Sequence, residues 1–349
     1  MEDLRILVAQ TGGWIGNMVL LTPALRALKI AYPQSHLALL LRPLVVDLMT
    51  SHPYIDEIII DDKAQSRSRL KTFWKLVSDV RQSRFDLAII LHPTSFRNAL
   101  IPLLASVPER VGSNVGGRGI LLTKSCSERA QLHEVHRYLR VLALIGIHEP
   151  RADLEFWHTS RDRDAVCQIL ATHGISPTDR VIGVNLGTTW QTKRWCLKNF
   201  AVAITEVQEY LGVPMLLTGS ASEIPFGEAL QQNTEAAIIN LIGKTTLMQL
   251  GALIERCDLY LTCDSGPMHI AAAVGTPTIA LFGPTSSRRH RPYGEGHYII
   301  EKPVVCRPCY KRTCPRKDKP NLCMTEIHPQ EVVNQILKVI QIPHEKKTD

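Results

Sequence analysis

Residues 259–285 constrain the fold of this chain more than any other part of its sequence. Residues 259–262 form an apolar run typical of a strand buried in a parallel sheet, and residues 277–282 have the same character. Between these runs, Asp264, Ser265 and Gly266 indicate a tight turn, and residues 268–274 indicate a short helix that Gly275 ends. The pattern predicts strand, turn, helix and strand, with the turn at the carboxyl end of the first strand.

This turn suits an anion. The first N–H groups of a helix have no partner within it, and the helix dipole is positive at that end. Ser265 adds a hydroxyl donor, and Gly266 lets a phosphate approach the backbone closely. Because Asp264 would repel a phosphate, we expect it to hold the turn or to face a sugar. The alternative is that Asp264 and Ser265 only cap the helix; His269 and the Gly-Thr-Pro at residues 275–277 favour a ligand site.

Strands and helices alternate along the rest of the chain, as they do in doubly wound α/β domains. We expect further strands at residues 5–9, 36–41, 57–60, 86–91, 110–112, 181–186 and 213–217. We expect helices at residues 18–32, 66–83, 96–105, 133–145, 162–173, 197–211, 248–257 and 328–340, and a loop at the glycine-rich residues 112–119.

The length of 349 residues exceeds one typical core and predicts two domains. A break in the helical pattern near residue 150 places them at residues 1–155 and 156–328. One interpretation of the last helix, residues 329–341, is that it crosses back onto the first domain. Residues 342–349 are a polar tail.

Composition narrows the class of protein. A hydrophobic content of 45% without a membrane-length apolar run, and a start that lacks a signal-peptide core, predict a cytoplasmic globular protein. Residues 1–150 contain 18 Lys and Arg against 13 Asp and Glu, a net charge of +5. This excess suits an anionic partner such as a phosphorylated lipid or a membrane surface, or it is an ordinary solvated surface. Aromatic residues do not interleave these charges, which disfavours nucleic acid.

A second turn follows the first strand, at Gly12, Gly13 and Gly16. The spacing G-G-x-x-G differs from the dinucleotide fingerprint G-x-G-x-x-G, and the next strand ends in Arg42 and not in a ribose-binding acid. An NAD-linked oxidoreductase is therefore disfavoured. His92 follows the strand at residues 86–91, where open parallel sheets bind ligands; it is a site candidate or an ordinary surface histidine.

Together these motifs resemble glycosyltransferase family 9, the lipopolysaccharide heptosyltransferases, and most nearly the heptosyltransferase II branch. The resemblance rests on D-S-G-x-x-H-x-A-A-x-x-G-x-P-x-x-x-L-F-G-x-T at residues 264–285, G-x-x-x-x-x-K-x-W at residues 187–195 and G-N-M-V-L-L-T-P-A-L-R-A-L-K at residues 16–29. It implies a GT-B fold, in which two doubly wound Rossmann-like domains face a cleft. It also implies an inverting, metal-independent transfer of heptose from ADP-heptose to the lipopolysaccharide inner core.

The resemblance assigns roles in the donor half. Lys193, in the loop that also carries Thr188, would meet the donor diphosphate, and a lysine at the end of a strand suits that role as a point charge. Glu223 would reach the ribose hydroxyls, or else it is an acid favoured at a helix start. Ser265 and Gly266 would contact the phosphate beside Asp264, and His269 would brace the turn.

In the acceptor half the sequence departs from the family pattern. Asn17 stands where the family has an aspartate taken as the base that deprotonates the acceptor hydroxyl. An amide cannot accept a proton at neutral pH, and a positioned base contributes roughly 10²–10⁴ in rate. Either another group such as His92, His133 or Glu134 is the base, or activity is low, or Asn17 only positions substrates.

Two alternatives to the heptosyltransferase interpretation stay open. One is a nucleotide-sugar-binding protein with little or no transferase activity, and the other is a transferase that uses a UDP- or GDP-linked hexose. The partners implied by the resemblance are a nucleotide-sugar donor and an anionic, lipid-linked saccharide acceptor, with peripheral contact to the cytoplasmic face of the inner membrane.

Nine cysteines, an odd number, do not indicate a disulfide framework in a cytoplasmic protein. Five of them lie among apolar neighbours and are expected to be small core residues: Cys126, Cys167, Cys196, Cys257 and Cys263. The other four form the pattern Cys306-x2-Cys309-x4-Cys314-x8-Cys323, whose spacing resembles a metal knuckle. Structural zinc and reduced, unliganded thiols both fit this pattern. No cofactor is expected otherwise.

Overall fold

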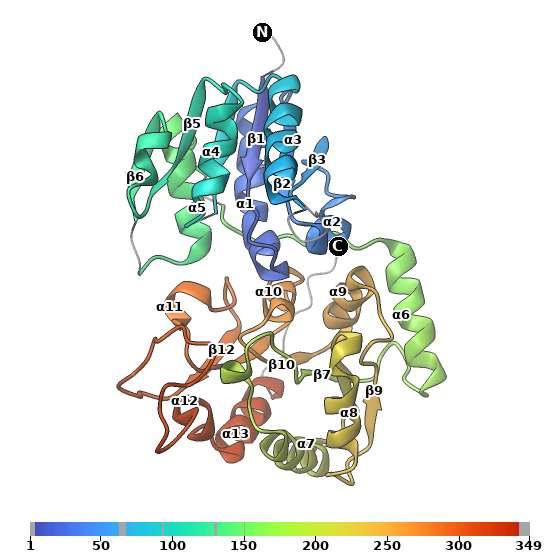
Figure 1. Cartoon of the computed structure of the whole chain (residues 1–349). Coiled ribbons are helices and arrows are strands. Elements are labelled where there is room, and N and C mark those ends of the chain that lie inside the picture. Colours follow the sequence, from blue (N-terminus) through green and yellow to red (C-terminus); the bar gives the residue numbers. More distant parts are fainter. Residues whose placement is uncertain (1–3, 63–67, 93, 129–130, 150, 342–349) are drawn as a thin grey trace. The chain divides into compact units, whose positions relative to one another are not determined.

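The computed structural model describes residues 4–62, 68–92, 94–128, 131–149 and 151–341 (Figure 1). The chain divides between Glu155 and Phe156 into two compact units. Each unit contains a six-stranded sheet whose paired neighbours all run parallel.

The first unit has the strand order β3-β2-β1-β4-β5-β6. Its strands are β1 (Arg5–Ala9), β2 (His36–Leu41), β3 (Glu57–Ile60), β4 (Leu87–Ile90), β5 (Glu109–Asn114) and β6 (Lys124–Ser127). Leu7 of β1 lies opposite Ala38 on one side and Ala88 on the other. The order reverses between β1 and β4, and ligands of open α/β sheets bind at such a reversal.

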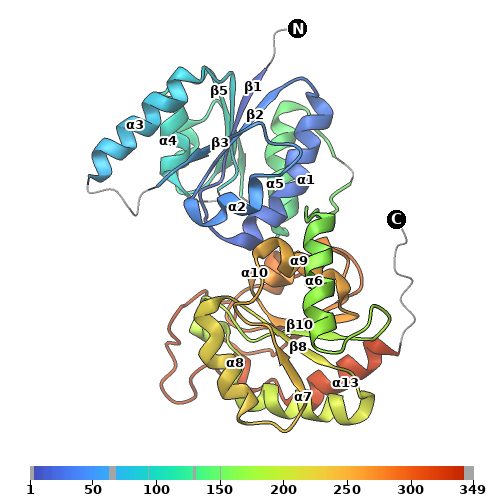
Figure 2. The same ribbon diagram turned by 90° about the vertical axis from the view of Figure 1, so that its right-hand side faces the viewer.

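The helices of this unit are α1 (Ile15–Ala31), α2 (Val46–Met49), α3 (Arg69–Gln82), α4 (Phe96–Leu104) and α5 (Glu134–Leu142), with the 3-10 turns η1 (Pro43–Val45), η2 (Arg118–Leu121) and η3 (Ala143–Ile145). Figure 2 shows α3 and α4 on one face of the sheet and α1 and α5 on the other. Leu76 and Val80 of α3 are buried with Leu7 and Ile90 in one core. These apolar faces orient the helices, so their first turns meet the carboxyl ends of the strands.

The second unit has the strand order β12-β11-β10-β7-β8-β9. Its strands are β7 (Ile182–Asn185), β8 (Met215–Thr218), β9 (Ile238–Asn240), β10 (Leu259–Cys263), β11 (Thr278–Phe282) and β12 (His297–Glu301). Its helices are α6 (Ser160–Thr172), α7 (Leu197–Leu211), α8 (Ile224–Gln231), α9 (Leu247–Arg256), α10 (Gly266–Ala273), α11 (Ser287–His290), α12 (Leu322–Thr325) and α13 (Pro329–Ile340), with the 3-10 turns η4 (Gln191–Lys193) and η5 (Ala221–Glu223). The order reverses between β10 and β7, directly beside the turn at Asp264.

The expected doubly wound α/β class is confirmed, and β1, β2, β3 and α7 have the bounds that the sequence predicted. Helix α1 begins at Ile15, before the expected residue 18, because the extended backbone ends at Trp14. The expected start of α3 at residues 66 and 67 lies outside the described residues. Strands β6, β9 and β12 were not predicted; each is short and lies at or next to a sheet edge, where an apolar run is not required.

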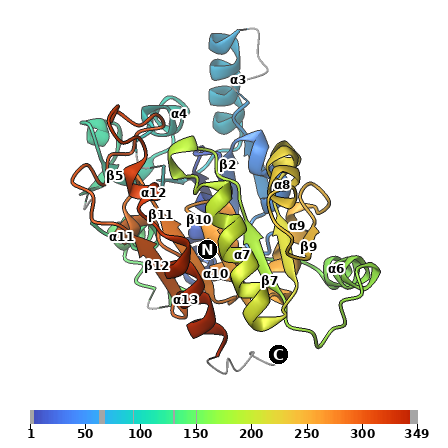
Figure 3. The same cartoon turned by 90° about the horizontal axis from the view of Figure 1, so that it is seen from below.

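Two expectations need correction, and a third stays a prediction. Residues 112–119 are not simply a loop: β5 continues to Asn114, and the fully buried Arg118 donates to the backbone oxygens of Ser113 and His92. The return of the last helix to the first domain stays a prediction, and what the structure shows is the place of this helix in the second unit. Apolar residues of α13 lie in the core of the second unit, and α13 packs beside α7 (Figure 3). Finally, Cys167 and Cys196 are exposed and are not core residues.

The polar tail at residues 342–349 lies outside the described residues. Among the helices that the structure describes, none is both long enough and apolar enough to span a bilayer.

Candidate active site

A buried ion pair marks the turn at the end of β10. Lys193 Nζ lies 2.7 Å from Asp264 Oδ2, and the Thr285 hydroxyl donates to the same oxygen at 2.5 Å. These residues come from three loops, which follow β7, β10 and β11. Parallel strands bring their carboxyl ends to one edge of the sheet, so the three loops meet there. Asp264 therefore fixes the position of Lys193 next to the N-terminus of α10.

The Asp264 carboxyl is ionised in this setting. Burial alone would raise its pKa, but the positive charges of Lys193 and His290, and the hydrogen bonds from Lys193 and Thr285, outweigh burial and lower it. The Lys193 ammonium also lies 4.7 Å from the centroid of the Trp190 ring. A cation is thus held in place on the edge where a ligand of the sheet would bind.

Ser265 takes the N-cap position of α10, yet its side chain makes no capping hydrogen bond. Its hydroxyl instead lies 3.0 Å from the Thr262 hydroxyl and 3.4 Å from Asn185 Oδ1. Because the Asp264 carboxylate accepts from Lys193 and Thr285, neither residue caps the helix as the alternative interpretation held. The first turn of α10 thus keeps the arrangement that favours an anion.

The loop after β7 carries Thr188 and Lys193 and lies against this turn. The Thr188 hydroxyl donates to the backbone oxygen of Asp264 at 3.4 Å. Arg194, which the sequence analysis did not single out, donates to the backbone oxygen of Thr188 and lies over the Phe226 ring, 3.9 Å from its centroid. The loop thus places two basic side chains at the same edge.

Glu223 serves a helix start, which is one of the two roles considered for it, while its contact with a ribose stays a prediction. Its Oε2 accepts from the backbone and hydroxyl of Ser220 in a capping box, at 2.7 and 3.0 Å. Its Oε1 lies against Gly187, where a Cβ would stand only 1.3 Å from it. Gly187 is therefore required to admit the carboxylate beside the loop that carries Lys193. One oxygen serves the helix start and the other faces the loop.

His269 and its neighbour Met268 are both buried in α10, and Met268 is part of the core. Trp195 is fully buried and donates from its ring nitrogen to the backbone oxygen of Ile327 at 2.9 Å, so it packs in the core. The buried position of His269 agrees with a bracing role more than with contact to a substrate.

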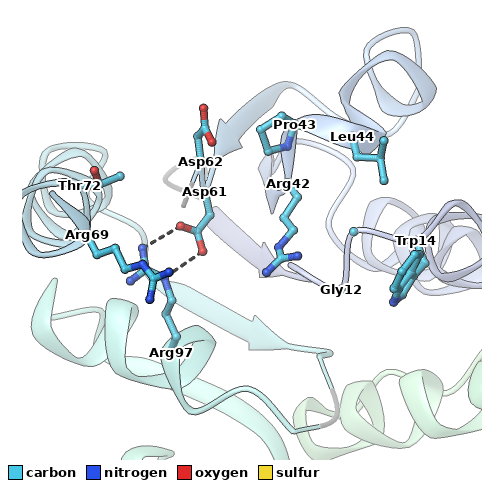
Figure 4. A pocket seen from close by; sticks show the side chains of 11 residues that line it. Gly12, Trp14, Arg42, Pro43, Leu44, Asp61, Asp62, Arg69, Thr72 and Arg97 are labelled. Carbon is cyan, nitrogen blue, oxygen red and sulfur yellow. Dashed lines mark hydrogen bonds and ion pairs between the residues drawn. The ribbon is translucent and has the colours of Figure 1, made fainter. Parts of the chain in front are cut away.

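The first unit contains a cavity of about 630 Å³ at the carboxyl ends of β1, β2 and β3 (Figure 4). Figure 4 shows Trp14 and Arg42 on one side of the cavity and Arg69 and Arg97 on the other, with Asp61 between them. Its lining is Gly12, Gly13, Trp14, Arg42, Pro43, Leu44, Asp61, Asp62, Arg69, Thr72 and Arg97. A volume of this size holds a small ligand or a few sugar rings.

The arginines of this cavity differ in their partners. Arg97 donates twice to the buried Asp61, at 2.9 and 2.7 Å, and lies over the Phe73 ring. This bidentate pair neutralises Arg97 and holds it in place. Arg42 packs beside Gly13, where a Cβ would stand 2.8 Å from its Cδ. Arg42 and Arg69 add positive charge that suits an anionic group.

Asn17 lies in the first turn of α1, against Gly12. A Cβ at Gly12 would stand 2.5 Å from Asn17 Nδ2, so the glycine makes room for the amide. His92 follows β4, and its Nδ1 accepts from the backbone N–H groups of Thr94 and Ser95 at 3.2 and 3.1 Å. In a neutral ring with Nδ1 as acceptor, the proton is on Nε2, and that nitrogen is then a donor. This tautomer, assigned from the hydrogen bonds, disfavours His92 as a base.

The two other candidate bases are engaged elsewhere. His133 caps α5 by accepting from the backbone of Val135, and the buried Glu134 pairs with Arg137 at 2.5 Å. Their partners explain both residues structurally, so neither needs a catalytic role. Within the described part of the chain, no three or more His, Cys, Asp or Glu side chains are placed to hold a metal ion.

The fold matches solved structures of known class. A crystal structure of a family 9 glycosyltransferase from Veillonella parvula superposes with a TM-score of 0.84 at 25% identity, over 97% of this chain and 98% of the other. The Escherichia coli ADP-heptose lipopolysaccharide heptosyltransferase II gives a TM-score of 0.76 at 24% identity, over the same shares of the two chains. The molecule is thus a GT-B glycosyltransferase by fold.

Sequence comparison defines the family. The model of glycosyltransferase family 9 (heptosyltransferase) matches residues 73–319. The lipooligosaccharide heptosyltransferase 2 of Haemophilus influenzae is 30% identical over 300 residues, which cover 82% of this chain and 86% of the relative. The lipopolysaccharide heptosyltransferase 2 of E. coli is 29% identical over 81% of this chain and 84% of its own length. The chain belongs to glycosyltransferase family 9.

Proposed function

We propose that this enzyme transfers heptose from ADP-heptose to the inner core of lipopolysaccharide, with inversion at the sugar carbon. The names of its relatives support the sugar and the acceptor. The observation that carries the proposal is the fixed ammonium of Lys193, held 2.7 Å from Asp264 beside the N-terminus of α10. Inversion follows from the family resemblance.

The chemical work of such a site is to stabilise the departing ADP. Negative charge develops on the diphosphate as the bond to the sugar breaks, and preorganised donors lower the barrier most when they already point at that charge. Lys193 supplies a charge, Ser265 a hydroxyl, and Gly266 an N–H at the first turn of α10. The Asp264 carboxylate keeps Lys193 in place, while its own charge is offset by Lys193 and Thr285.

The nucleoside would lie beside β7 and β8. Glu223 Oε1, which lies against Gly187, is the oxygen available to a ribose diol, since Oε2 serves Ser220. Thr188 belongs to the same loop and positions the backbone of Asp264. These contacts suit the ribose and diphosphate of a nucleotide sugar, and the ADP-heptose named for the structural relative from E. coli supports ADP as the nucleotide.

The acceptor would bind in the cavity of the first unit. Its volume of about 630 Å³ suits a saccharide, and Arg42 and Arg69 suit a carboxylate or phosphate carried by that saccharide. Arg97 is already neutralised by Asp61 and holds the cavity wall. We therefore assign the acceptor as an anionic, lipid-linked saccharide.

Transfer also requires removal of the proton from the acceptor hydroxyl. Asn17 occupies the position of the family base but can only orient the acceptor hydroxyl. His92 presents a donor nitrogen by the tautomer assigned above. A nucleotide-sugar-binding protein with little transferase activity is the second candidate function, and Asn17 is the observation that favours it.

A lipid-linked acceptor requires contact with a membrane, and α3 offers a surface for it. Leu70 and Trp74 are 67% and 52% exposed and lie one turn apart, next to the exposed Lys71 and Lys75. Arg69 and Thr72 of the same helix line the acceptor cavity. Exposed apolar and aromatic side chains flanked by lysines suit an anionic lipid surface. We place the enzyme in the cytoplasm, where its nine cysteines would stay reduced.

A transfer assay tests this function. Purified enzyme is incubated with ADP-heptose and an inner-core acceptor, and release of ADP and formation of the heptosylated acceptor are measured. Product formation supports the heptosyltransferase. Tight ADP binding without turnover would instead support the binding protein. Turnover with a UDP- or GDP-linked sugar, and none with ADP-heptose, would overturn the assignment of the donor.

A further inference from the structure

The four clustered cysteines line one small cavity in the second unit. Cys306, Cys309, Cys314 and Cys323 all border a space of about 10 Å³, which is room for one water-sized particle. Three of them lie in the segment between β12 and α12, and Cys323 lies in α12. All four are free thiols. The fold therefore brings together the residues whose spacing alone suggested a metal knuckle.

The backbone around the cavity makes one hydrogen bond to a cysteine sulfur and fixes the position of the first two cysteines. The N–H of Asn321 donates to Cys314 Sγ at 3.2 Å. The N–H groups of Cys309 and Tyr310 both donate to the backbone oxygen of Pro284 at 2.9 Å, which ties the first pair of cysteines to the end of β11. Backbone N–H groups that donate to sulfur are the usual outer partners of a thiolate–metal centre.

We propose that Cys306, Cys309, Cys314 and Cys323 bind one tetrahedral, zinc-class metal ion. Four sulfur ligands in a pattern that contains Cys-x2-Cys are the donor set that Zn²⁺ prefers in structural sites. Each thiol loses its proton to solvent when the ion binds. As placed, no three described side chains form a group that could hold an ion, so binding of the ion would have to bring the four sulfur atoms closer together.

The site has a consequence for the donor loops. Thr192, next to Lys193, lines the same cavity and donates to the backbone oxygen of Lys311 at 2.7 Å. Arg307 donates to the backbone oxygen of Thr285 at 3.4 Å, and the Arg312 guanidinium lies 5.4 Å from the Trp190 ring centroid. The cysteine segment thus contacts the loops of both Lys193 and Thr285. An ion that closes this segment would hold the Lys193–Asp264 pair in place, an effect that rests on the proposed function.

Metal content tests the site separately from the activity. The full chain is purified without chelators under reducing conditions, and zinc and iron are measured by mass spectrometry. Protein stripped of metal is then titrated with Co²⁺, because tetrahedral thiolate coordination gives characteristic visible and charge-transfer absorption. We expect about one ion per chain and a tetrahedral thiolate cobalt spectrum. A stoichiometric content of zinc supports the proposal, whereas iron in its place would keep the four ligands and overturn the zinc-class assignment. Absence of both ions together with failure of the stripped protein to bind Co²⁺ or Zn²⁺ would overturn it.

Variants locate the ion. Cys306→Ser combined with Cys309→Ser should reduce bound metal at least tenfold, whereas Cys167→Ser, an exposed cysteine elsewhere, should leave it unchanged. Metal retained in the double variant would contradict the assignment of ligands.

Calorimetric ADP binding by the stripped wild type is measured in parallel. If the protein binds metal but removal of the metal leaves its ADP affinity unchanged, the metal site stands and its support of the donor loops is refuted. If the proposed function fails, the metal content stays the same.

Discussion

Lys193 Nζ and Asp264 Oδ2 lie 2.7 Å apart, with only 15% and 6% of the two side chains exposed. A charge pair so well buried is costly to break from one side, since the remaining charge loses both water and its partner. The pair therefore couples the stability of the second unit to the proposed diphosphate contact. Variants can separate the contribution of this pair to stability from its contribution to ADP binding.

Lys193→Ala should lower the free energy of unfolding by about 3 kcal/mol and weaken ADP binding at least tenfold. The double variant with Asp264→Asn should regain much of the stability, because no unpaired charge remains, but not the affinity. Urea denaturation and calorimetry measure the two effects. Lys198→Ala, an exposed lysine at the start of α7, is the control. ADP affinity restored in the double variant would refute the contact of Lys193 with the donor.

Asn17→Asp should raise the turnover rate about tenfold or more, because the variant supplies a base at the family position without a change in side-chain volume. The rate constant is measured with saturating ADP-heptose and acceptor. Asn17→Leu, which removes the amide without adding a base, is the comparison. A rate in the aspartate variant equal to or below that of the wild type would show that this position does not limit proton transfer.

Arg42→Ala and Arg69→Ala should each raise the acceptor KM by roughly 10–100-fold, the worth of one charge-assisted hydrogen bond. Their ADP affinity should stay at the wild-type value, because both residues line the cavity of the first unit. Steady-state kinetics with varied acceptor measure the change, and Arg161→Ala in α6 is an exposed control. An unchanged acceptor KM in both variants would remove the acceptor from this cavity.

Leu70→Ser combined with Trp74→Ser should reduce binding to vesicles of anionic phospholipid several-fold, since both exposed side chains would leave the lipid interface. Co-sedimentation with vesicles measures the bound fraction. The control is Tyr210→Ser, which alters a side chain exposed to a similar degree on α7. Equal losses in both proteins, or none in either, would argue against α3 as the docking surface.

His52 predicts a pH dependence of stability. Its side chain is buried, and burial lowers the pKa to about 4. Between pH 6.5 and pH 4 the unfolded chain binds a proton that the folded chain does not, so stability falls as the pH falls through this window, by roughly 2–3 kcal/mol. Denaturation curves at several pH values measure the slope, which His52→Asn should reduce. A wild-type slope retained in that variant would assign the effect to other groups.

The donor turn could be predicted from sequence because its residues are contiguous. Asp264, Ser265 and Gly266 follow a buried strand directly, and the apolar runs of β10 and β11 on either side of α10 predict a strand–helix–strand unit with this turn at the carboxyl end of β10. The partners of Asp264 could not be predicted in the same way. Lys193 and Thr285 follow other strands, and only the strand order β11-β10-β7 brings the three loops together.

The cavity of the first unit was missed for a related reason. Arg69 and Arg97 belong to helices whose first turns meet at the edge of β3, β2 and β1, and no local motif links them. Polar residues directly after each predicted strand, such as Arg42 and Asp61, were the available signal. The alternatives for Glu223 could not be separated from sequence, since the same position satisfies a capping box and lies beside Gly187.

The central claim is that the second unit binds the ADP portion of an ADP-linked sugar. Calorimetric titration of the wild type with ADP, UDP and GDP tests it most directly. The structure and the family lead us to expect micromolar binding of ADP, at least tenfold tighter than that of UDP or GDP, and loss of that binding in Lys193→Ala. Equal affinity for the three nucleotides, or a preference for UDP or GDP, would contradict the claim.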